Sequence, residues 1–267
     1  MPRKHRLDLH LLTQGLAASR QKAQQLIRAG KVRDRNGQIL DKPGKEVPDD
    51  LELLIKGSPR FVSRGGDKLI EALRAFSLEV SGKICLDGGI STGGFTDCLL
   101  QHGASLVYGV DVGYGQIAWT LRNDPRVVLK ERTNLRTLTP DKLYRPQDQW
   151  PSFAVADLSF ISLCIVLPAI RSLLHPENAE AVLLVKPQFE VGRDRVGKGG
   201  VVHNPAGHVD ALHSVISTAA EQKWYPQGIV PSPITGPAGN HEYLLWLGAH
   251  GASQLPDIQE LVENTLS

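Results

Sequence analysis

The segment from Ile84 to Asp97, which reads I-C-L-D-G-G-I-S-T-G-G-F-T-D, constrains the fold more than any other part of the chain. A short apolar run ends in the acidic residue Asp87, four glycines follow, and a helical pattern begins at Phe95. This order predicts a buried strand, a tight turn and a helix N-terminus. Glycines let a backbone come close to a ligand, and the free N–H groups of a helix start attract carboxylates or phosphates. The segment therefore predicts a ligand-binding turn.

Further apolar runs that end in a charged residue follow along the chain and are separated by helix-forming sequence. This alternation predicts an α/β fold with a doubly wound sheet. Ligands bind at the carboxyl ends of the strands in such sheets, so the charged residues at these ends are candidate site residues. They are Asp87, Asp111, Asp157 and Lys186. Two late apolar segments, 228–230 and 243–247, predict an antiparallel pair at one edge of the sheet.

The chain has 267 residues, of which 41% are hydrophobic and 22% charged, as is ordinary for a folded protein. This length accommodates one large domain and a small one. No apolar run approaches the roughly 18 residues of a membrane helix, and no signal core follows the N-terminus, so we expect a cytoplasmic protein without a membrane anchor. Cys85, Cys98 and Cys164 lack a C-x-x-C spacing, so we expect buried thiols without disulfides or a metal.

Positive charge is concentrated at the N-terminus. Residues 1–35 hold nine Lys and Arg residues and two acidic residues, a net charge of +7. Because the whole chain carries +2, the remainder carries −5. Any single one of these charges is better explained as part of a solvated helix face. The cluster as a whole indicates a polyanion partner, and we expect RNA.

Two short helices are predicted in this basic segment, the second capped by Ser19 and ended by Gly30, with short strands near Val32, Ile39 and Val47. The pattern R-L-D…S-R-x-x-A-x-x-L-I-x-x-G-x-V, within about the first 55 residues, resembles the S4 RNA-binding module of ribosomal proteins and RNA-modifying enzymes. The resemblance implies a small α+β domain that docks on structured RNA by shape and backbone. The candidate RNA-binding residues are Arg3, Lys4, Arg6, Arg20, Lys22, Arg28 and Lys31.

The glycine-rich turn, with an acid at the end of the next strand, fits either a dinucleotide or S-adenosylmethionine. The turn lacks the G-x-G-x-x-G spacing, and Asp87 is poorly placed beside a pyrophosphate. An acid at that position suits a ligand with a sulfonium and an ammonium group, and Asp111 would then accept hydrogen bonds from a ribose diol. The alternative is that both acids only cap turns.

Four charged residues at predicted element starts or ends form a second candidate set: Lys68, Asp157, Lys186 and Glu242. A ribose 2′-hydroxyl is a poor nucleophile, so its methylation requires a group that orients it and removes its proton. A lysine can do this when desolvation or a second cation lowers its pKa, whereas nearby carboxylates oppose that shift. Lys186 alone would be an ordinary surface lysine, but the K-P-Q-F-E run and the loop 192–202 favour a site.

The whole chain resembles the TlyA type of ribosomal RNA methyltransferase, often labelled haemolysin-like, whose catalytic domain is related to FtsJ enzymes. The matching motifs keep the family's order almost from end to end. They are S-R-G-G-D-K-L (63–69), L-D-G-G-I-S-T-G-G-F-T-D-C-L-L (86–100), V-Y-G-V-D-V-G-Y-G-Q (107–116), E-R-T-N-L-R (131–136), A-D-L-S-F-I-S-L (156–163), K-P-Q-F-E-V-G (186–192), G-K-G-G-V-V (197–202) and G-N-H-E-Y (239–243).

This resemblance implies a Rossmann-like class I methyltransferase sheet, S-adenosylmethionine as cofactor and no metal. The family's K-D-K-E catalytic tetrad maps onto Lys68, Asp157, Lys186 and Glu242. Its methyl-donor site maps onto Asp87, Gly88, Gly89, Ser91, Thr92, Gly93, Gly94, Phe95 and Asp111. The implied reaction is 2′-O-methylation of cytidine in 16S or 23S ribosomal RNA or both, with ribosomal RNA or ribosomal subunits as partners.

We expect an S4 domain over 1–56, a linker over 57–67, a methyltransferase domain over 68–250 and a C-terminal tail over 251–267. Three alternative functions stay open: a ribosome-binding or assembly factor without catalysis, a membrane-active haemolysin, and a methyltransferase that acts on a base nitrogen. An intact tetrad disfavours the first, and the lack of an apolar span disfavours the second. The third usually has an N-P-P-Y-type strand end, where this chain has Ala156-Asp157-Leu158-Ser159.

Overall fold

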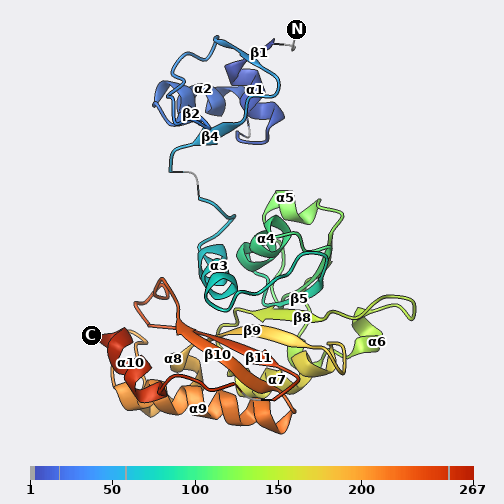
Figure 1. Cartoon of the computed structure of the whole chain (residues 1–267), viewed down its shortest axis with the longest axis vertical. Coiled ribbons are helices and arrows are strands. Elements are labelled where there is room, and N and C mark those ends of the chain that lie inside the picture. The colour runs from blue at the N-terminus through green and yellow to red at the C-terminus, as the bar shows by residue number, and fades with distance from the viewer. Residues whose placement is uncertain (1–3, 18, 58, 252) are drawn as a thin grey trace. The chain divides into compact units, whose positions relative to one another are not determined.

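The chain folds into two compact units, Met1–Pro59 and Arg60–Ser267, in a computed structural model that describes residues 4–17, 19–57, 59–251 and 253–267 (Figure 1). Each unit has a hydrophobic core of its own. The larger unit holds the sheet that the strand pattern predicts.

The first unit contains two helices and two small antiparallel sheets, in which β1 pairs with β3 and β2 with β4. The side chain of Ser19 accepts a hydrogen bond from the Lys22 N–H at 3.2 Å, which confirms the predicted cap of α2. Ile39 forms an isolated bridge with Arg33 instead of a strand, and β1 and β4 were not predicted. The elements are β1 (Lys4–Arg6), α1 (Leu7–Thr13), α2 (Arg20–Arg28), β2 (Val32–Asp34), β3 (Glu46–Pro48) and β4 (Leu53–Ile55).

The second unit is built on a seven-stranded sheet with the order β10-β11-β9-β8-β5-β6-β7. The strands from β9 to β7 run parallel, whereas β11 is antiparallel to β9 and β10 is antiparallel to β11. The predicted doubly wound sheet and its antiparallel edge pair are therefore confirmed. The strands are β5 (Ile84–Gly88), β6 (Leu106–Val110), β7 (Val127–Lys130), β8 (Phe153–Ala156), β9 (Glu180–Val185), β10 (Tyr225–Pro231) and β11 (Tyr243–Gly248).

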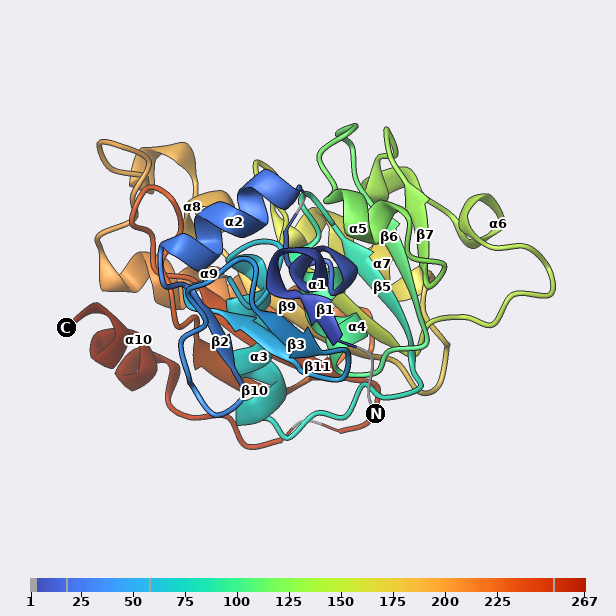
Figure 2. The same ribbon diagram turned by 90° about the horizontal axis from the view of Figure 1, so that it is seen from above.

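Helices cover both faces of this sheet (Figures 1 and 2). Helices α3, α4 and α5 pack in the hydrophobic core on one face of the sheet. Helices α7, α9 and α10 pack in the core on the other face. The helices are α3 (Gly65–Ala75), α4 (Gly94–Gln101), α5 (Trp119–Arg122), α6 (Pro140–Leu143), α7 (Leu163–Ser172), α8 (Pro187–Glu190), α9 (Pro205–Glu221) and α10 (Ile258–Leu266), with short 3₁₀ turns η1 (Leu135–Thr137) and η2 (Arg193–Arg195).

Two predicted boundaries differ from the structure. The linker was predicted over 57–67, but Phe61 is buried, the Val62 N–H donates to Asp97 at 2.8 Å, and α3 already begins at Gly65. The predicted C-terminal tail contains α10, whose Val262 is fully buried in the core. In both places a few apolar side chains reach the core although the local sequence is mostly polar or rich in turn residues.

Candidate active site

The glycine-rich turn between β5 and α4 holds a buried carboxyl group at its start. Asp87 is 1% exposed, and its Oδ2 accepts a hydrogen bond of 2.6 Å from the Thr96 hydroxyl. Its other oxygen, Oδ1, is buried without a hydrogen-bond partner among the described residues. Burial raises the pKa of Asp87 to about 7, an effect that the Thr96 hydrogen bond opposes and the charges of Asp157 and Asp111 reinforce. A buried acceptor without a partner fits a cationic ligand group.

Two glycines allow the turn to pack tightly against its neighbours. Gly89 has a φ of +81°, and a Cβ there would lie 2.9 Å from the carbonyl oxygen of Asp157. A Cβ at Gly94 would lie 2.9 Å from the backbone nitrogen of Gly66 in α3. Both are contacts that real Cβ atoms do not make with backbone, so the turn requires glycine at these positions.

Two adjoining cavities, of about 310 and 500 Å³, lie at the carboxyl ends of the parallel strands. They share four lining residues, Gly89, Ser91, Asp157 and Ser159. Of the predicted donor residues, the first cavity has Asp87, Gly89, Ser91, Thr92, Gly94 and Phe95 in its wall, and the second has Gly89, Ser91 and Asp111. Gly88 and Gly93 line neither cavity; Gly88 packs against the Leu135 side chain and Gly93 against that of Leu121. An elongated ligand with two chemically different ends fits this pair.

Asp111 follows β6 and ties the turn to the next loop. Its carboxylate accepts hydrogen bonds from the Ser91 N–H at 2.8 Å and the Gly113 N–H at 2.7 Å. These bonds fix the carboxylate in the wall of the second cavity. Carboxylate oxygens accept more than one hydrogen bond, so acceptor capacity remains for a ribose diol.

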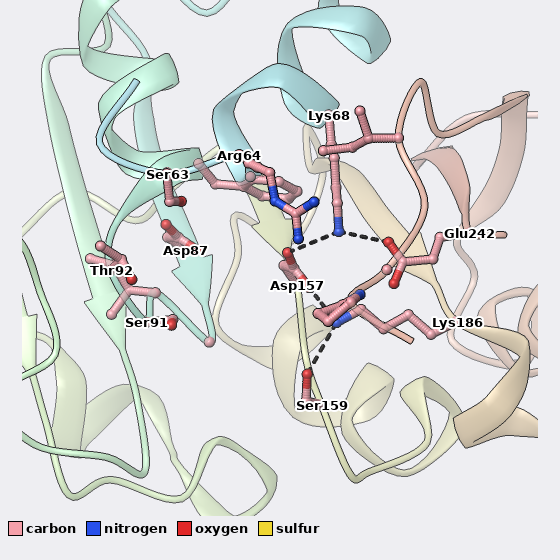
Figure 3. A pocket seen from close by; sticks show the side chains of 18 of the residues that line it. Ser63, Arg64, Lys68, Asp87, Ser91, Thr92, Asp157, Ser159, Lys186 and Glu242 are labelled. Carbon is pink, nitrogen blue, oxygen red and sulfur yellow. Dashed lines mark hydrogen bonds and ion pairs between the residues drawn. The ribbon is translucent and has the colours of Figure 1, made fainter. Parts of the chain in front are cut away.

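The four charged residues that the sequence singles out meet in the first cavity (Figure 3). Lys68 Nζ lies 2.6 Å from Glu242 Oε2 and 3.7 Å from Asp157 Oδ2. Lys186 Nζ lies 2.6 Å from Asp157 Oδ1, so Asp157 joins the two lysines. Both lysines and Glu242 are buried, whereas the Asp157 side chain is 24% exposed. Two positive and two negative charges therefore balance in a largely desolvated cluster.

Several neighbours of this cluster were missed by sequence reasoning. Ser159 lines both cavities, and its hydroxyl accepts a hydrogen bond of 3.1 Å from Lys186 Nζ. Arg64 lines the first cavity, where its guanidinium points toward Asp157 (Figure 3). Both stand inside the recognised motifs 156–163 and 63–69, so the signal was present in the sequence.

Phe160 is a further residue that the sequence did not single out. Its side chain is 92% exposed and its φ is +65°, a conformation that non-glycine residues rarely adopt. Its ring centroid lies 5.3 Å from that of Phe189, and Lys186 Nζ lies 5.9 Å from the Phe189 ring centroid. A strained and exposed aromatic side chain close to a buried lysine is typical of a functional site.

The predicted RNA-binding residues of the first unit all lie on its surface where the structure describes them. Lys4, Arg6, Arg20, Lys22, Arg28 and Lys31 are exposed, and Arg3 lies outside the described residues. They come from β1, from α2 and from the segment after α2. The cluster remains a predicted RNA contact.

A buried aspartate connects two of these arginines. Asp8 is 0% exposed and accepts from Arg6 Nε at 3.1 Å, from Arg20 Nε at 3.0 Å and from the Gln24 amide at 2.9 Å. The hydrogen bond from Arg6 is the main reason why the pKa of Asp8 lies well below its usual range. The carboxylate thus holds two half-exposed guanidinium groups side by side.

In the described ranges, no helix is long and apolar enough to cross a bilayer. No group of three or more His, Cys, Asp or Glu residues in the same ranges could hold a metal ion. Cys85 and Cys98 are buried free thiols, and burial raises the pKa of each to about 12. Cys164 is a free, partly buried thiol.

Two family models match the chain. The model described as FtsJ-like methyltransferase matches residues 61–249, and that of the S4 domain matches residues 5–53. The first match spans the two cavities and the charged cluster.

Individual relatives match over nearly the whole chain. The 16S/23S rRNA (cytidine-2′-O)-methyltransferase TlyA of Mycobacterium tuberculosis is 51% identical over 92% of this chain and 91% of its own length. Hemolysin A of Brachyspira hyodysenteriae is 40% identical over 90% of this chain and 98% of its own. A solved structure from Streptococcus thermophilus, provisionally titled a haemolysin, has a TM-score of 0.72 and 42% identity and covers 99% of this chain and 96% of its own.

Proposed function

Since the chain belongs to the family of FtsJ-like methyltransferases that carry an S4 domain, we propose that it methylates the ribose 2′-hydroxyl of cytidine in ribosomal RNA. S-adenosylmethionine is the methyl donor. One observation carries the proposal: Lys186 Nζ lies between Asp157 Oδ1 and Ser159 Oγ, and both of these residues belong to the wall that the two cavities share. A hydroxyl placed at this wall would meet both the lysine and the donor.

The residues present fit the donor. Asp87, with its unpartnered Oδ1, would accept from the ammonium group, and the turn that begins at Gly89 would hold the carboxylate near the start of α4. Asp111 would accept from the ribose diol in the second cavity. When bound, S-adenosylmethionine supplies an electrophilic methyl group.

The charged cluster activates the acceptor. Lys186 Nζ, once its ammonium group has released a proton to solvent, would accept the proton of the 2′-hydroxyl and so make that oxygen nucleophilic toward the methyl group that the donor would supply. Asp157 orients Lys186, and Lys68 is the second cation beside Asp157. Glu242 holds Lys68 from the other side at 2.6 Å. Positioning in this arrangement supplies a large part of the rate.

Phe160 would provide a stacking surface for the target base. A base that leaves its helical stack needs a new stacking partner, and aromatic side chains supply it. The exposed face of Phe160 next to the second cavity meets this need and would bring the attached ribose toward Lys186.

The first unit, which matches the S4 domain, supports ribosomal RNA as the partner. Its exposed arginines and lysines would bind the backbone of structured ribosomal RNA, in the subunits or free, in the cytoplasm where ribosomes form. The arginine pair held by Asp8 would form a preorganised phosphate contact.

Asp8→Asn is expected to weaken RNA binding, because Arg6 and Arg20 lose their shared anion. The slope of log affinity against log salt should become shallower by about one to two, as for the loss of one or two phosphate contacts. Binding of the full chain to ribosomal subunits over a salt series measures this slope. Asp34→Asn is the matched control, since Asp34 only caps a turn by accepting from the Gln38 N–H. An unchanged slope in Asp8→Asn would contradict the role of the pair.

Mapping ribose methylation tests the function directly. Ribosomal RNA from cells that lack this protein should gain 2′-O-methylcytidine at defined positions when the chain and S-adenosylmethionine are added. Calorimetry with S-adenosylmethionine separates the enzyme from a non-catalytic ribosome-binding factor, which need not bind the donor. Donor binding without any new ribose methylation of either subunit would reject the proposal.

A further inference from the structure

We propose that Tyr114 and Arg132 form a platform that stacks an unpaired base of the RNA substrate beside the methyl-donor pocket. The guanidinium carbon of Arg132 lies 4.2 Å from the centroid of the Tyr114 ring, well within the range of a cation–π contact. Tyr114 is 64% exposed and Arg132 is exposed as well. The pair thus presents flat, positively charged surface to solvent. RNA bases stack on such surfaces, both on aromatic rings and on guanidinium planes.

The platform is held rigidly by the backbone around it. Arg132 has a φ of +52°, which costs free energy in a non-glycine residue unless the surroundings enforce it. Its N–H donates to the Gly113 carbonyl at 3.0 Å, and the Thr133 N–H donates to the Asp111 carbonyl at 2.8 Å. These bonds join the loop after β7 to the loop after β6. A preorganised surface loses less entropy when a ligand binds.

The platform of Tyr114 and Arg132 is separate from Phe160, the stacking surface proposed for the target base. Tyr114 follows β6 and Phe160 follows β8, and β5 lies between these strands in the sheet. The two strands are two strand spacings apart, about 10 Å, so we assign the two aromatic residues to different bases. Tyr114 and Arg132 would therefore hold a second nucleotide of the same RNA.

Exposed apolar side chains flank Tyr114 in the sequence, one on the same loop and one at the first residue of α5. Val112 is 71% exposed and Trp119 is 76% exposed, on either side of Tyr114. Val112 also lines the second cavity together with Asp111. Large apolar side chains left in water around a site mark a surface that is covered when a partner binds.

The charge of the loops that carry Tyr114 and Arg132 favours RNA as the partner. Glu131 is neutralised by Arg122, whose guanidinium nitrogens lie 2.7 and 2.9 Å from its carboxylate oxygens. Neither Arg132 nor Arg136 forms an ion pair within the part of the chain that the structure describes. Aromatic and apolar side chains interleaved with such arginines favour a polyanion with flat bases.

The proposal rests on the proposed function for its substrate, and binding measurements test it apart from catalysis. The full chain is titrated with ribosomal subunits from cells that lack the protein, and with the protein-free RNA of those subunits. Tyr114→Ala and Arg132→Ala are each expected to weaken binding to both probes by about 5- to 100-fold. The double variant should lose less than the product of the two, because both residues build one platform. Tyr114→Phe keeps the ring face and should retain the affinity.

Trp150→Ala is the matched control, because Trp150 is a partly exposed aromatic residue that precedes β8 and so lies toward the opposite end of the sheet. Its RNA affinity should equal that of the unaltered chain, and calorimetry should show unchanged donor affinity in every variant. Unchanged RNA affinity in Tyr114→Ala and Arg132→Ala would overturn the proposal. So would a loss confined to donor binding, or a loss on subunits but not on protein-free RNA, which would indicate a ribosomal protein as the partner. If the unaltered chain methylates no ribosomal RNA while Tyr114→Ala still loses RNA affinity, the proposed function fails and the platform stands.

Discussion

Lys186→Ala is expected to slow methyl transfer to ribosomal RNA by about 100- to 10,000-fold, the usual contribution of a positioned general base. Lys186 Nζ is held by Asp157 and Ser159 at the wall between the two cavities, and the alanine variant removes this amine and leaves only the weakly basic carboxylate of Asp157 there. Lys186→Arg should be nearly as slow, because a guanidinium keeps the charge but does not accept a proton at neutral pH. Single-turnover methylation of unmethylated subunits measures both.

A matched lysine controls for this prediction. Lys83 also pairs with a carboxylate, Glu180, at 2.7 Å, but it precedes β5 and so lies at the opposite end of the sheet. Lys83→Ala should methylate at the rate of the unaltered chain. Retained methyl transfer by a folded Lys186→Ala protein that binds S-adenosylmethionine would refute the assignment.

Asp87→Asn is expected to change the pH dependence of folding in the absence of the donor. Burial raises the pKa of Asp87 from the ordinary 3.8 to about 7. The folded chain therefore binds this proton more tightly than the unfolded chain does. The resulting contribution to stability is complete below about pH 4 and is lost as the pH rises through 7, which corresponds to about 4 kcal/mol. Asparagine does not titrate, so this slope should disappear from its unfolding free energy.

Urea unfolding at a series of pH values measures the slope, and the difference between the two proteins isolates Asp87 from the other titrating groups. Thr96→Val serves as a graded control, because loss of its hydrogen bond should raise the pKa of Asp87 further and move the transition to higher pH. Donor affinity of Asp87→Asn should fall by roughly 10- to 100-fold at pH 8, as for the loss of a charged hydrogen bond. Parallel pH profiles for Asp87→Asn and the unaltered chain would show that the carboxyl group is not the source.

The sequence alone was sufficient to predict the sheet and the place of its charged residues. Apolar runs that end in Asp87, Asp111, Asp157 and Lys186 are local patterns, and parallel strands bring their ends to one edge whatever the loops do. The glycine-rich turn could be predicted for the same reason, because the close backbone contacts at Gly89 and Gly94 leave no room for a side chain.

What could not be predicted depends on contacts between distant segments. Asp8 looked like one acid in a basic segment, and only the fold shows that Arg6 and Arg20 converge on it. The backbone strain at Phe160 and Arg132 has no signature in composition or periodicity. The helix α10 was read as a tail because its apolar residues are few, although its packing partner α9 lies some forty positions earlier in the chain.

The antiparallel direction of β11 determines which of its two ends lies beside the charged cluster. Tyr243 is the first residue of β11 and is paired with Val185, the last residue of β9. Glu242 precedes β11 and Lys186 follows β9, yet the two residues lie next to each other, just beyond the same end of the paired strands. Had β11 run parallel to β9, the residue before it would lie at the far end of the sheet. The place of Glu242 in the charged cluster is thus set by the direction of β11, and amide hydrogen exchange along the β9–β11 ladder would report whether this pairing is intact.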